Sequence, residues 1–296
     1  MTAQQPLRRF SLLASRSALV VRPVWPDDAR GHSTLGGRVR MFRRLAMLVG
    51  WTVLCMPVQA LFLTVPGRGK IVFARQFWAV FTAILGVRVR LLGEMARPHY
   101  GRAVIFVSNH SSWVDIAVLG GRLEGCFVAK EDVARWPIIR IIARLGRTIF
   151  VSRQRASTAR ERDDMQARLA AGDGIILFPE GTTSDGARVL PFRTPFFAIA
   201  SHNPAPIIQP VSIVYDRLGG LPLGRASRTA FSWFGDMEIA SHYANFGQLR
   251  GMRVSVLLHT PLDPRDFPDR KMLAQEVWRI VADGAARLRQ NRPATE

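Results

Sequence analysis

The chain has 296 residues, of which 48% are hydrophobic and 21% charged, so an intrinsically disordered chain is excluded. The length suffices for one large domain or two small ones. An excess of 41 Lys and Arg over 22 Asp and Glu gives a net charge of +19. This charge indicates a polyanionic neighbour: nucleic acid, an anionic membrane face or an acidic carrier protein. Cys55 and Cys126 lie in apolar runs, which excludes a disulfide framework and favours a reducing compartment.

Residues 1–36 mix Arg, Ser, Pro and Gly without a sustained period, and we expect a basic, poorly ordered arm. A twin-arginine export signal is disfavoured, because Arg16 interrupts the apolar stretch behind Arg8 and Arg9 and no small-residue cleavage site follows.

Residues 45–65 carry no charge and are long enough to cross a hydrocarbon core of about 30 Å as a helix. A shorter apolar stretch follows at 77–87, and basic residues flank the pair. Together they predict a helical hairpin that lies in one leaflet with both basic ends on the same side. The alternatives are a single spanning helix and a buried hairpin in a soluble protein.

The alternation at Val87–Leu92 predicts an edge strand. Beyond it, short apolar runs alternate with helical candidates, which predicts an α/β fold with a largely parallel sheet covered by helices. We expect three segments: the arm 1–36, a membrane-associated helical hairpin with the edge strand at 37–92, and an α/β domain at 93–296. The runs lie at 103–107, 126–129, 148–151, 174–178, 207–215 and 254–259, and the helical candidates at 112–120, 132–145, 156–171, 194–202 and 270–289.

Asn109, His110 and Asp115 follow the run 103–107, at the kind of strand end where catalytic groups gather. Residues five apart on one helix point about 140° away from each other. His110 and Asp115 can therefore pair only if His110 lies in the loop and Asp115 in the first helical turn. The carboxylate would then orient the imidazole as a general base. The alternative is a polar loop with Asn109 or a serine capping the helix.

A second polar turn, at 178–186, follows the run 174–178 and offers Glu180, Gly181 and Thr182 to a polar head group. An ordinary turn is the alternative. Lys130 and Arg153 each lie at the end of a predicted strand, where they would bind a phosphate or carboxylate unless they are solvated surface residues.

The segment 206–211 has two prolines around an apolar run, which suggests a shaped wall or a strand entry. Its alternative is an edge strand or a bulge.

These four segments, in this order, resemble the blocks of the glycerolipid acyltransferase family, whose best-known members are the 1-acylglycerol-3-phosphate acyltransferases. NHSSWVD matches the Asn-His-x4-Asp block, and GRTIFVSR matches the second block except at Ser152. FPEGTTSDG matches the third block, and PIIQPV the looser fourth. The resemblance covers about residues 40–260. The stretches 189–200 and 221–239 are also similar to a bacterial branch that includes lyso-ornithine lipid acyltransferases.

The resemblance implies transfer of a fatty acyl group from acyl carrier protein or coenzyme A to the hydroxyl of a lysolipid acceptor, at the cytoplasmic face of the inner membrane. The first acceptor implied is 1-acylglycerol-3-phosphate, and lyso-ornithine lipid is the alternative. His110 would be the general base and Asp115 would orient it. The residues implied to contact the acceptor are Asn109, Lys130, Arg153, Glu180, Gly181 and Thr182.

We expect no metal and no cofactor, since the six histidines have no zinc-site spacing. A nucleic-acid partner is not expected, because the chain has no recognisable binding motif and its basic residues do not interleave with aromatic ones. An inactive membrane scaffold is disfavoured by the intact His110, Asp115 and Glu180.

Overall fold

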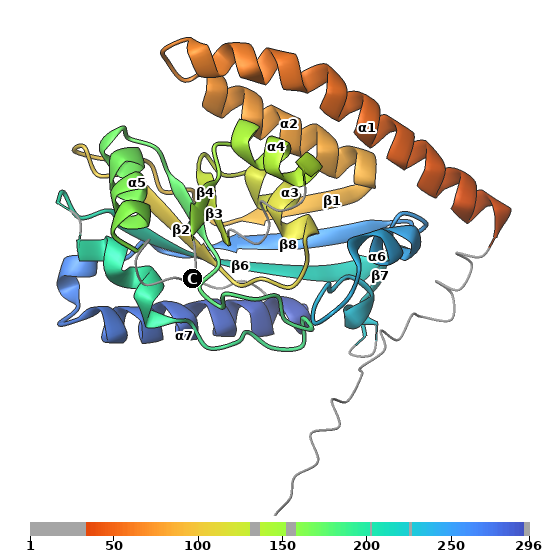
Figure 1. Cartoon of the computed structure of the whole chain (residues 1–296). Coiled ribbons are helices and arrows are strands. Elements are labelled where there is room, and N and C mark those ends of the chain that lie inside the picture. The colour runs from red at the N-terminus through yellow and green to blue at the C-terminus, as the bar shows by residue number, and fades with distance from the viewer. Residues whose placement is uncertain (1–33, 131–136, 152–157, 202, 225–226, 293–296) are drawn as a thin grey trace, which may run out of the picture.

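The computed structural model describes residues 34–130, 137–151, 158–201, 203–224 and 227–292, and it contains an eight-stranded mixed sheet (Figure 1). Most neighbouring strands of the described sheet are parallel, and the antiparallel pairs are β6 with β8 and β6 with β7. The expected α/β class is therefore confirmed. In spatial order the strands are β1 (Val87–Leu92), β8 (Met252–Leu258), β6 (Ile207–Leu218), β2 (Val104–Ser108), β5 (Ile175–Leu177), β3 (Cys126–Lys130) and β4 (Ile149–Val151), with β7 (Leu221–Pro222) beside β6.

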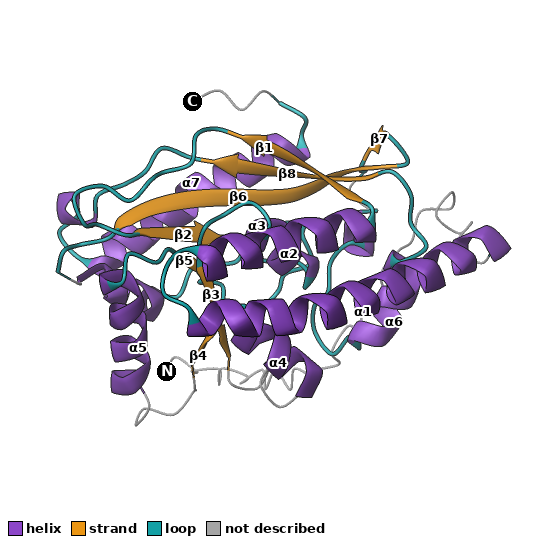
Figure 2. Ribbon diagram, turned by 90° about the horizontal axis from the view of Figure 1, so that it is seen from above, coloured by secondary structure: helices purple, strands orange, loops and turns teal. Residues whose placement is uncertain are grey.

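Helices cover both faces of the sheet, as Figure 2 shows from above, and each face has its own apolar core. One core joins the sheet to α2 (Gly69–Leu85), α3 (Val114–Gly120) and α6 (Ile239–Phe246). The other joins it to α5 (Thr158–Ala170) and α7 (Arg270–Arg289). The helix expected at 194–202 is a 3-10 helix, η4 (Thr194–Ser201), and belongs to this second core. Helix α4 (Pro137–Leu145) precedes β4.

The proline-containing strand β6 lies inside the sheet, which differs from the edge or bulge offered as an alternative. Pro210 is tolerated because it lies opposite His259, the residue that follows the last residue of β8. Its carbonyl accepts the His259 N–H at 3.0 Å. The Gln209 amide donates to the His259 carbonyl at 2.9 Å and so replaces the N–H that proline lacks.

The expected helical hairpin is present as α1 (Leu35–Thr64) and α2, and both helices extend beyond the uncharged runs. One stripe of α1 faces the rest of the protein, since its buried positions recur at intervals of seven and four residues. These positions are Gly37, Arg44, Leu48, Cys55 and Gln59.

Two polar side chains attach α1 to the α/β core at points 15 residues apart in sequence. The buried Arg44 guanidinium donates to the carbonyls of Gly247 at 2.8 Å and Leu249 at 2.9 Å. The Gln59 amide donates to the Leu145 carbonyl at 2.7 Å. Gly86, with φ +80°, leaves room for Arg44, because a Cβ there would overlap the guanidinium. Helix α1 therefore lies along the core.

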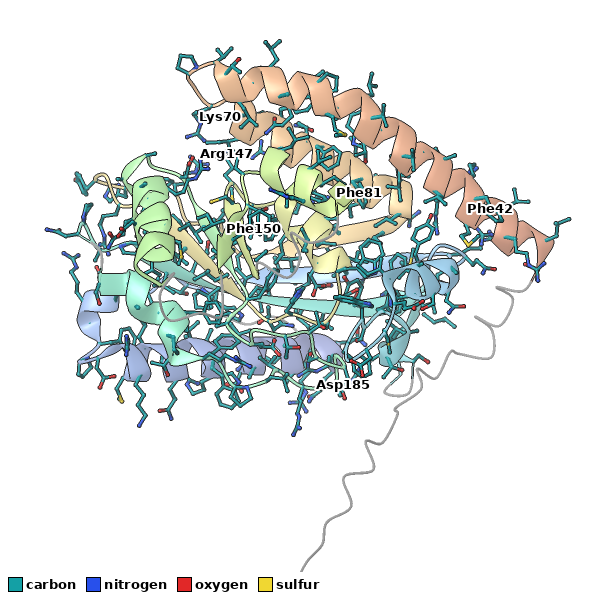
Figure 3. The ribbon with its side chains drawn as sticks, viewed as in Figure 1. Phe42, Lys70, Phe81, Arg147, Phe150 and Asp185 are labelled. Carbon is teal, nitrogen blue, oxygen red and sulfur yellow. The ribbon has the colours of Figure 1, made fainter. Side chains whose placement is uncertain are left out.

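The outer face of α1 is apolar and uncovered. By length and composition this helix could cross a membrane. Figure 3 shows Phe42 projecting from it near its N-terminal end. The exposed large apolar side chains of this face are Leu35, Val39, Phe42, Leu45, Met47, Val49, Val53, Leu54, Val58, Leu61 and Leu63.

Strand β1, which the sequence groups with the hairpin, pairs along its whole length with β8 and forms the edge of the sheet, as expected. Most of the arm 1–36 lies outside the described residues. The division into three segments stays a prediction.

Candidate active site

His110 lies in the loop after β2, and Asp115 lies in the first turn of α3. The His110 Nδ1 and the Asp115 Oδ2 are 2.9 Å apart. With His110 in the loop and Asp115 in the first helical turn, the structure meets the condition under which residues five apart can pair. The His110 side chain is 15% exposed and Asp115 is fully buried. With Nδ1–H donating to the carboxylate, the lone pair of the imidazole lies on Nε2.

The buried Asp115 carboxylate is fully satisfied by hydrogen-bond donors. Oδ2 also accepts the backbone N–H groups of Ser111 at 2.7 Å and Ser112 at 2.9 Å. Oδ1 accepts the Tyr215 hydroxyl at 2.7 Å. Burial, with Asp115 nearby, raises the pKa of Tyr215 well above its usual value, so the phenol keeps its proton and donates. The network therefore holds a buried anion against the imidazole.

Glu180 holds the backbone of His110. One carboxylate oxygen accepts the His110 N–H at 2.7 Å, and the other accepts the Leu190 N–H at 3.0 Å. The Ser184 N–H donates to the His110 carbonyl at 2.9 Å. Glu180 is 2% exposed, and burial raises its pKa to about 8, although both N–H bonds and the Arg289 guanidinium favour the charged form.

An aromatic wall lines the other side of the imidazole. The ring of His110 stacks on Phe178 with centroids 4.0 Å apart, and Phe178 stacks on Phe127 at 6.0 Å. Stacking fixes the plane of the imidazole, while Asp115 fixes its rotation in that plane. Contacts within the protein therefore fix the orientation of the imidazole.

The other residues predicted to contact the acceptor lie in several different environments. Both polar atoms of the buried Asn109 amide pair with the backbone of Ile213, at 3.0 and 2.8 Å. Gly181 and the exposed Thr182 follow Glu180 in the turn. Arg153 and the side chain of Lys130 lie outside the described residues. In the part of the chain that is described, no three His, Cys, Asp or Glu side chains cluster closely enough to hold a metal ion.

Sequence reasoning missed the role of Tyr215, although the residue closes the predicted strand 207–215. A signal existed, because β2 and β6 are parallel and their carboxyl ends meet at one edge of the sheet. A buried tyrosine hydroxyl also needs a hydrogen-bond partner. The role of Phe178, whose ring faces the imidazole, has no comparable sequence signal.

We expect the buried Glu180 to give folding a distinct pH dependence. Because its pKa is raised to about 8, the native state retains a proton that the unfolded chain releases near its ordinary value of about 4.3. The free energy of unfolding should therefore fall as the pH rises from about 5 to about 8. Glu180→Gln should remove this slope. Thermal denaturation in detergent across that range measures it.

The matched control is Glu238→Gln, which changes an exposed carboxylate and should keep the wild-type slope. Because Glu180→Gln also replaces an acceptor by a donor, its stability at low pH should be lower than that of wild type, and the slope is the quantity that tests the raised pKa. Parallel pH profiles for wild type and Glu180→Gln would contradict the raised pKa.

Comparison with known proteins is consistent with this geometry. A family model described as Acyltransferase matches residues 88–214. A lyso-ornithine lipid O-acyltransferase of Brucella abortus is 37% identical over 246 residues, which cover 81% of this chain and 91% of that protein. The protein of that name from Rhizobium meliloti is 34% identical, with 80% and 84% covered.

More distant relatives point the same way. A 1-acyl-sn-glycerol-3-phosphate acyltransferase of Neisseria gonorrhoeae is 24% identical over 64% of this chain and 73% of that protein. The crystal structure of the 1-acyl-sn-glycerophosphate acyltransferase of Thermotoga maritima has the same fold, with a TM-score of 0.63 and 22% identity over 90% of this chain and all of that one. This chain belongs to the glycerolipid acyltransferase family and is an acyltransferase of the lysophospholipid type.

Proposed function

We propose that this protein transfers a fatty acyl group from a thioester of acyl carrier protein or coenzyme A to the hydroxyl of lyso-ornithine lipid. The His110–Asp115 pair at the sheet edge carries the assignment of the chemistry. The acceptor is supported by the relatives named lyso-ornithine lipid O-acyltransferases at 37% and 34% identity. The second candidate is 1-acylglycerol-3-phosphate, which the sequence motifs placed first and the Neisseria relative favours.

His110 acts as the general base. Its Nε2 takes the proton of the acceptor hydroxyl while that oxygen attacks the thioester carbonyl carbon. The carbon–sulfur bond then breaks, and the imidazolium returns the proton to the leaving thiolate. The products are the acylated lipid and a free thiol, and no covalent enzyme intermediate forms. A positioned general base contributes about 10²–10⁴ in rate.

Asp115 stabilises the imidazolium that forms during the reaction. Its carboxylate is buried, so its interaction with the ring is only weakly screened by water. The Tyr215 hydroxyl and the two serine N–H groups keep the carboxylate in place and charged.

Asn109 and Glu180 act as positioning residues, because their polar atoms already hold the backbones of Ile213, His110 and Leu190. Gly181 and Thr182 remain the candidates for contacts to the acceptor from this turn. Lys130 and Arg153 are proposed to bind its anion. The chemistry described uses no metal or cofactor. The basic surface is proposed to meet anionic lipid and the acidic carrier protein or coenzyme A phosphates, and not nucleic acid.

The hairpin is proposed to lie in the cytoplasmic leaflet of the inner membrane. Contacts through Arg44 and Gln59 tie both halves of α1 to the α/β core, and a helix crossing the bilayer would have to break one of them. The apolar face of α1 is directed away from that core. A helix that is apolar on one side and bound to a protein on the other is suited to lie along the membrane surface.

Cysteine labelling of intact spheroplasts tests this placement. Single cysteines at Arg38 and at Arg68, both exposed, should be protected from a membrane-impermeant thiol reagent and become labelled after permeabilisation. The native Cys55 and Cys126 are buried and provide a low background. Labelling of either engineered cysteine from outside would contradict the hairpin in the cytoplasmic leaflet.

Tyr215→Phe should lower kcat about tenfold or more, because one donor to a buried charge is lost. The carboxylate would then hold the imidazolium more strongly, so the acid limb of the pH–rate profile should move to higher pH. Tyr243→Phe is the control, since its hydroxyl donates to the Met41 carbonyl at 3.0 Å, away from His110. An unmoved acid limb in Tyr215→Phe would mean that the hydroxyl does not act through Asp115.

His110→Ala should reduce acyl transfer at least a hundredfold with the fold intact, because Asp115 keeps three other donors. Purified enzyme is assayed with acyl carrier protein and coenzyme A thioesters on lyso-ornithine lipid and 1-acylglycerol-3-phosphate. His99→Ala, at an exposed histidine, is the control. Retention of more than about a tenth of the wild-type rate would rule out His110 as the base. A higher kcat/KM for the phosphate acceptor would reverse the choice of acceptor.

A further inference from the structure

The segment that ends in Arg193 is fixed against the turn that carries Glu180. The Leu190 N–H donates to Glu180 at 3.0 Å, and the Arg193 N–H donates to the Pro179 carbonyl at 2.9 Å. The other oxygen of the same carboxylate accepts the His110 N–H. The backbone from Leu190 to Arg193 is therefore held at a fixed position relative to His110, because Glu180 binds both Leu190 and His110.

The Arg193 side chain lies directly over Gly181. A Cβ built on Gly181 would come within 3.1 Å of the Arg193 Nε, 3.2 Å of its Cδ and 3.3 Å of its Cζ. Gly181 also has φ +66°, which residues with a side chain rarely adopt. Glycine at this position therefore permits the turn and leaves room for the guanidinium above it. Gly181 directly follows Glu180, so its Cα lies about 3.8 Å from that of Glu180.

The guanidinium of Arg193 is exposed, and within the described ranges no carboxylate or carbonyl pairs with it. Several other arginines differ in this respect, since Arg75, Arg102 and Arg253 each pair with a carboxylate. The neighbouring Glu180 uses its two oxygens for the backbone N–H groups of His110 and Leu190 and makes no ion pair with Arg193. A cation thus lies beside the active-site turn with its donors turned to solvent.

We propose that Arg193 binds the carboxylate of the acceptor head group and so selects an ornithine-type acceptor. This inference rests on the proposed function, which supplies an acceptor with a free hydroxyl and an anion. A guanidinium presents two parallel N–H donors that match a carboxylate. Held over Gly181, it anchors the head group while the hydroxyl reaches the Nε2 of His110. The role is distinct from that proposed for Arg153, which belongs to a different sequence motif.

Acceptor kinetics with Arg193→Gln test the proposal. The contact exists in the ground state and the transition state alike, so the apparent KM for lyso-ornithine lipid should rise about ten- to a hundredfold with kcat nearly unchanged. The KM for the thioester donor should not move. Arg193→Lys should recover part of the affinity, because it restores the charge without the paired donors.

A neutral acceptor identifies the group that Arg193 binds. The methyl ester of lyso-ornithine lipid lacks the carboxylate charge, so wild-type enzyme should bind it as weakly as Arg193→Gln binds the acid. The variant should not distinguish acid from ester. Arg188→Gln is the matched control, because Arg188 is an exposed arginine on the same stretch of chain. It should keep the wild-type KM for both acceptors.

An unchanged acceptor KM in Arg193→Gln, or discrimination between acid and ester equal to that of wild type, would overturn the inference and leave acyl transfer standing. A raised KM for 1-acylglycerol-3-phosphate alone would also overturn it, in favour of a phosphate site. If wild-type enzyme transferred no acyl group to any lysolipid, the proposed function itself would fail.

Discussion

The geometry of the active site depends on the buried carboxylate of Glu180, which accepts backbone N–H groups from both His110 and Leu190. These N–H groups come from segments that are 80 residues apart. Each loop also forms other backbone hydrogen bonds, but Glu180 is a partner that the two share. Loss of this carboxylate would leave two buried N–H groups without an acceptor, and a buried unpaired donor costs about 1–3 kcal/mol. The position of the loop that carries His110 thus depends on Glu180, a residue outside the motif that contains His110 and Asp115.

The sheet brings these parts together. Strand β2 lies between β5 and β6 and runs parallel to both, so His110, Glu180 and Tyr215 all follow or lie near carboxyl ends at one edge. In the proposed mechanism, His110 supplies the base, Glu180 holds the backbone of His110, and Tyr215 holds the Asp115 carboxylate that pairs with it. Each comes from a different strand, which explains why a rigid, fully buried β2 matters for chemistry performed by a loop.

Sequence reasoning identified features that depend on neighbouring residues and missed contacts between segments far apart in the sequence. Helix geometry and the five-residue spacing set the condition under which His110 and Asp115 can pair, and the structure meets that condition. The strand order, with β6 in the interior, did not follow, because Pro210 normally marks an edge and the compensating amide of Gln209 is a tertiary contact. The motif identified Glu180 as functional, but only the structure shows that its oxygens hold the backbone of another loop. For Asn109, likewise, only the structure shows that its amide pairs with the Ile213 backbone in β6.

The placement of α1 connects this edge to a lipid surface. Its buried stripe, from Gly37 to Gln59, repeats with the period of a helix packed on one side. Its uncovered side is mainly apolar, with Arg38 and Arg43 exposed near the N-terminal end. Figure 1 shows the N-terminal half of α1 beside α6, at the end of the sheet toward which β6 runs. His110 follows β2, which runs parallel to β6. An amphiphilic acceptor has its hydroxyl at the membrane interface. In the proposed placement, α1 lies in that interface and sets the distance of His110 from the lipid. Arg44, which joins α1 to the residues after α6, couples the helix to the α/β core.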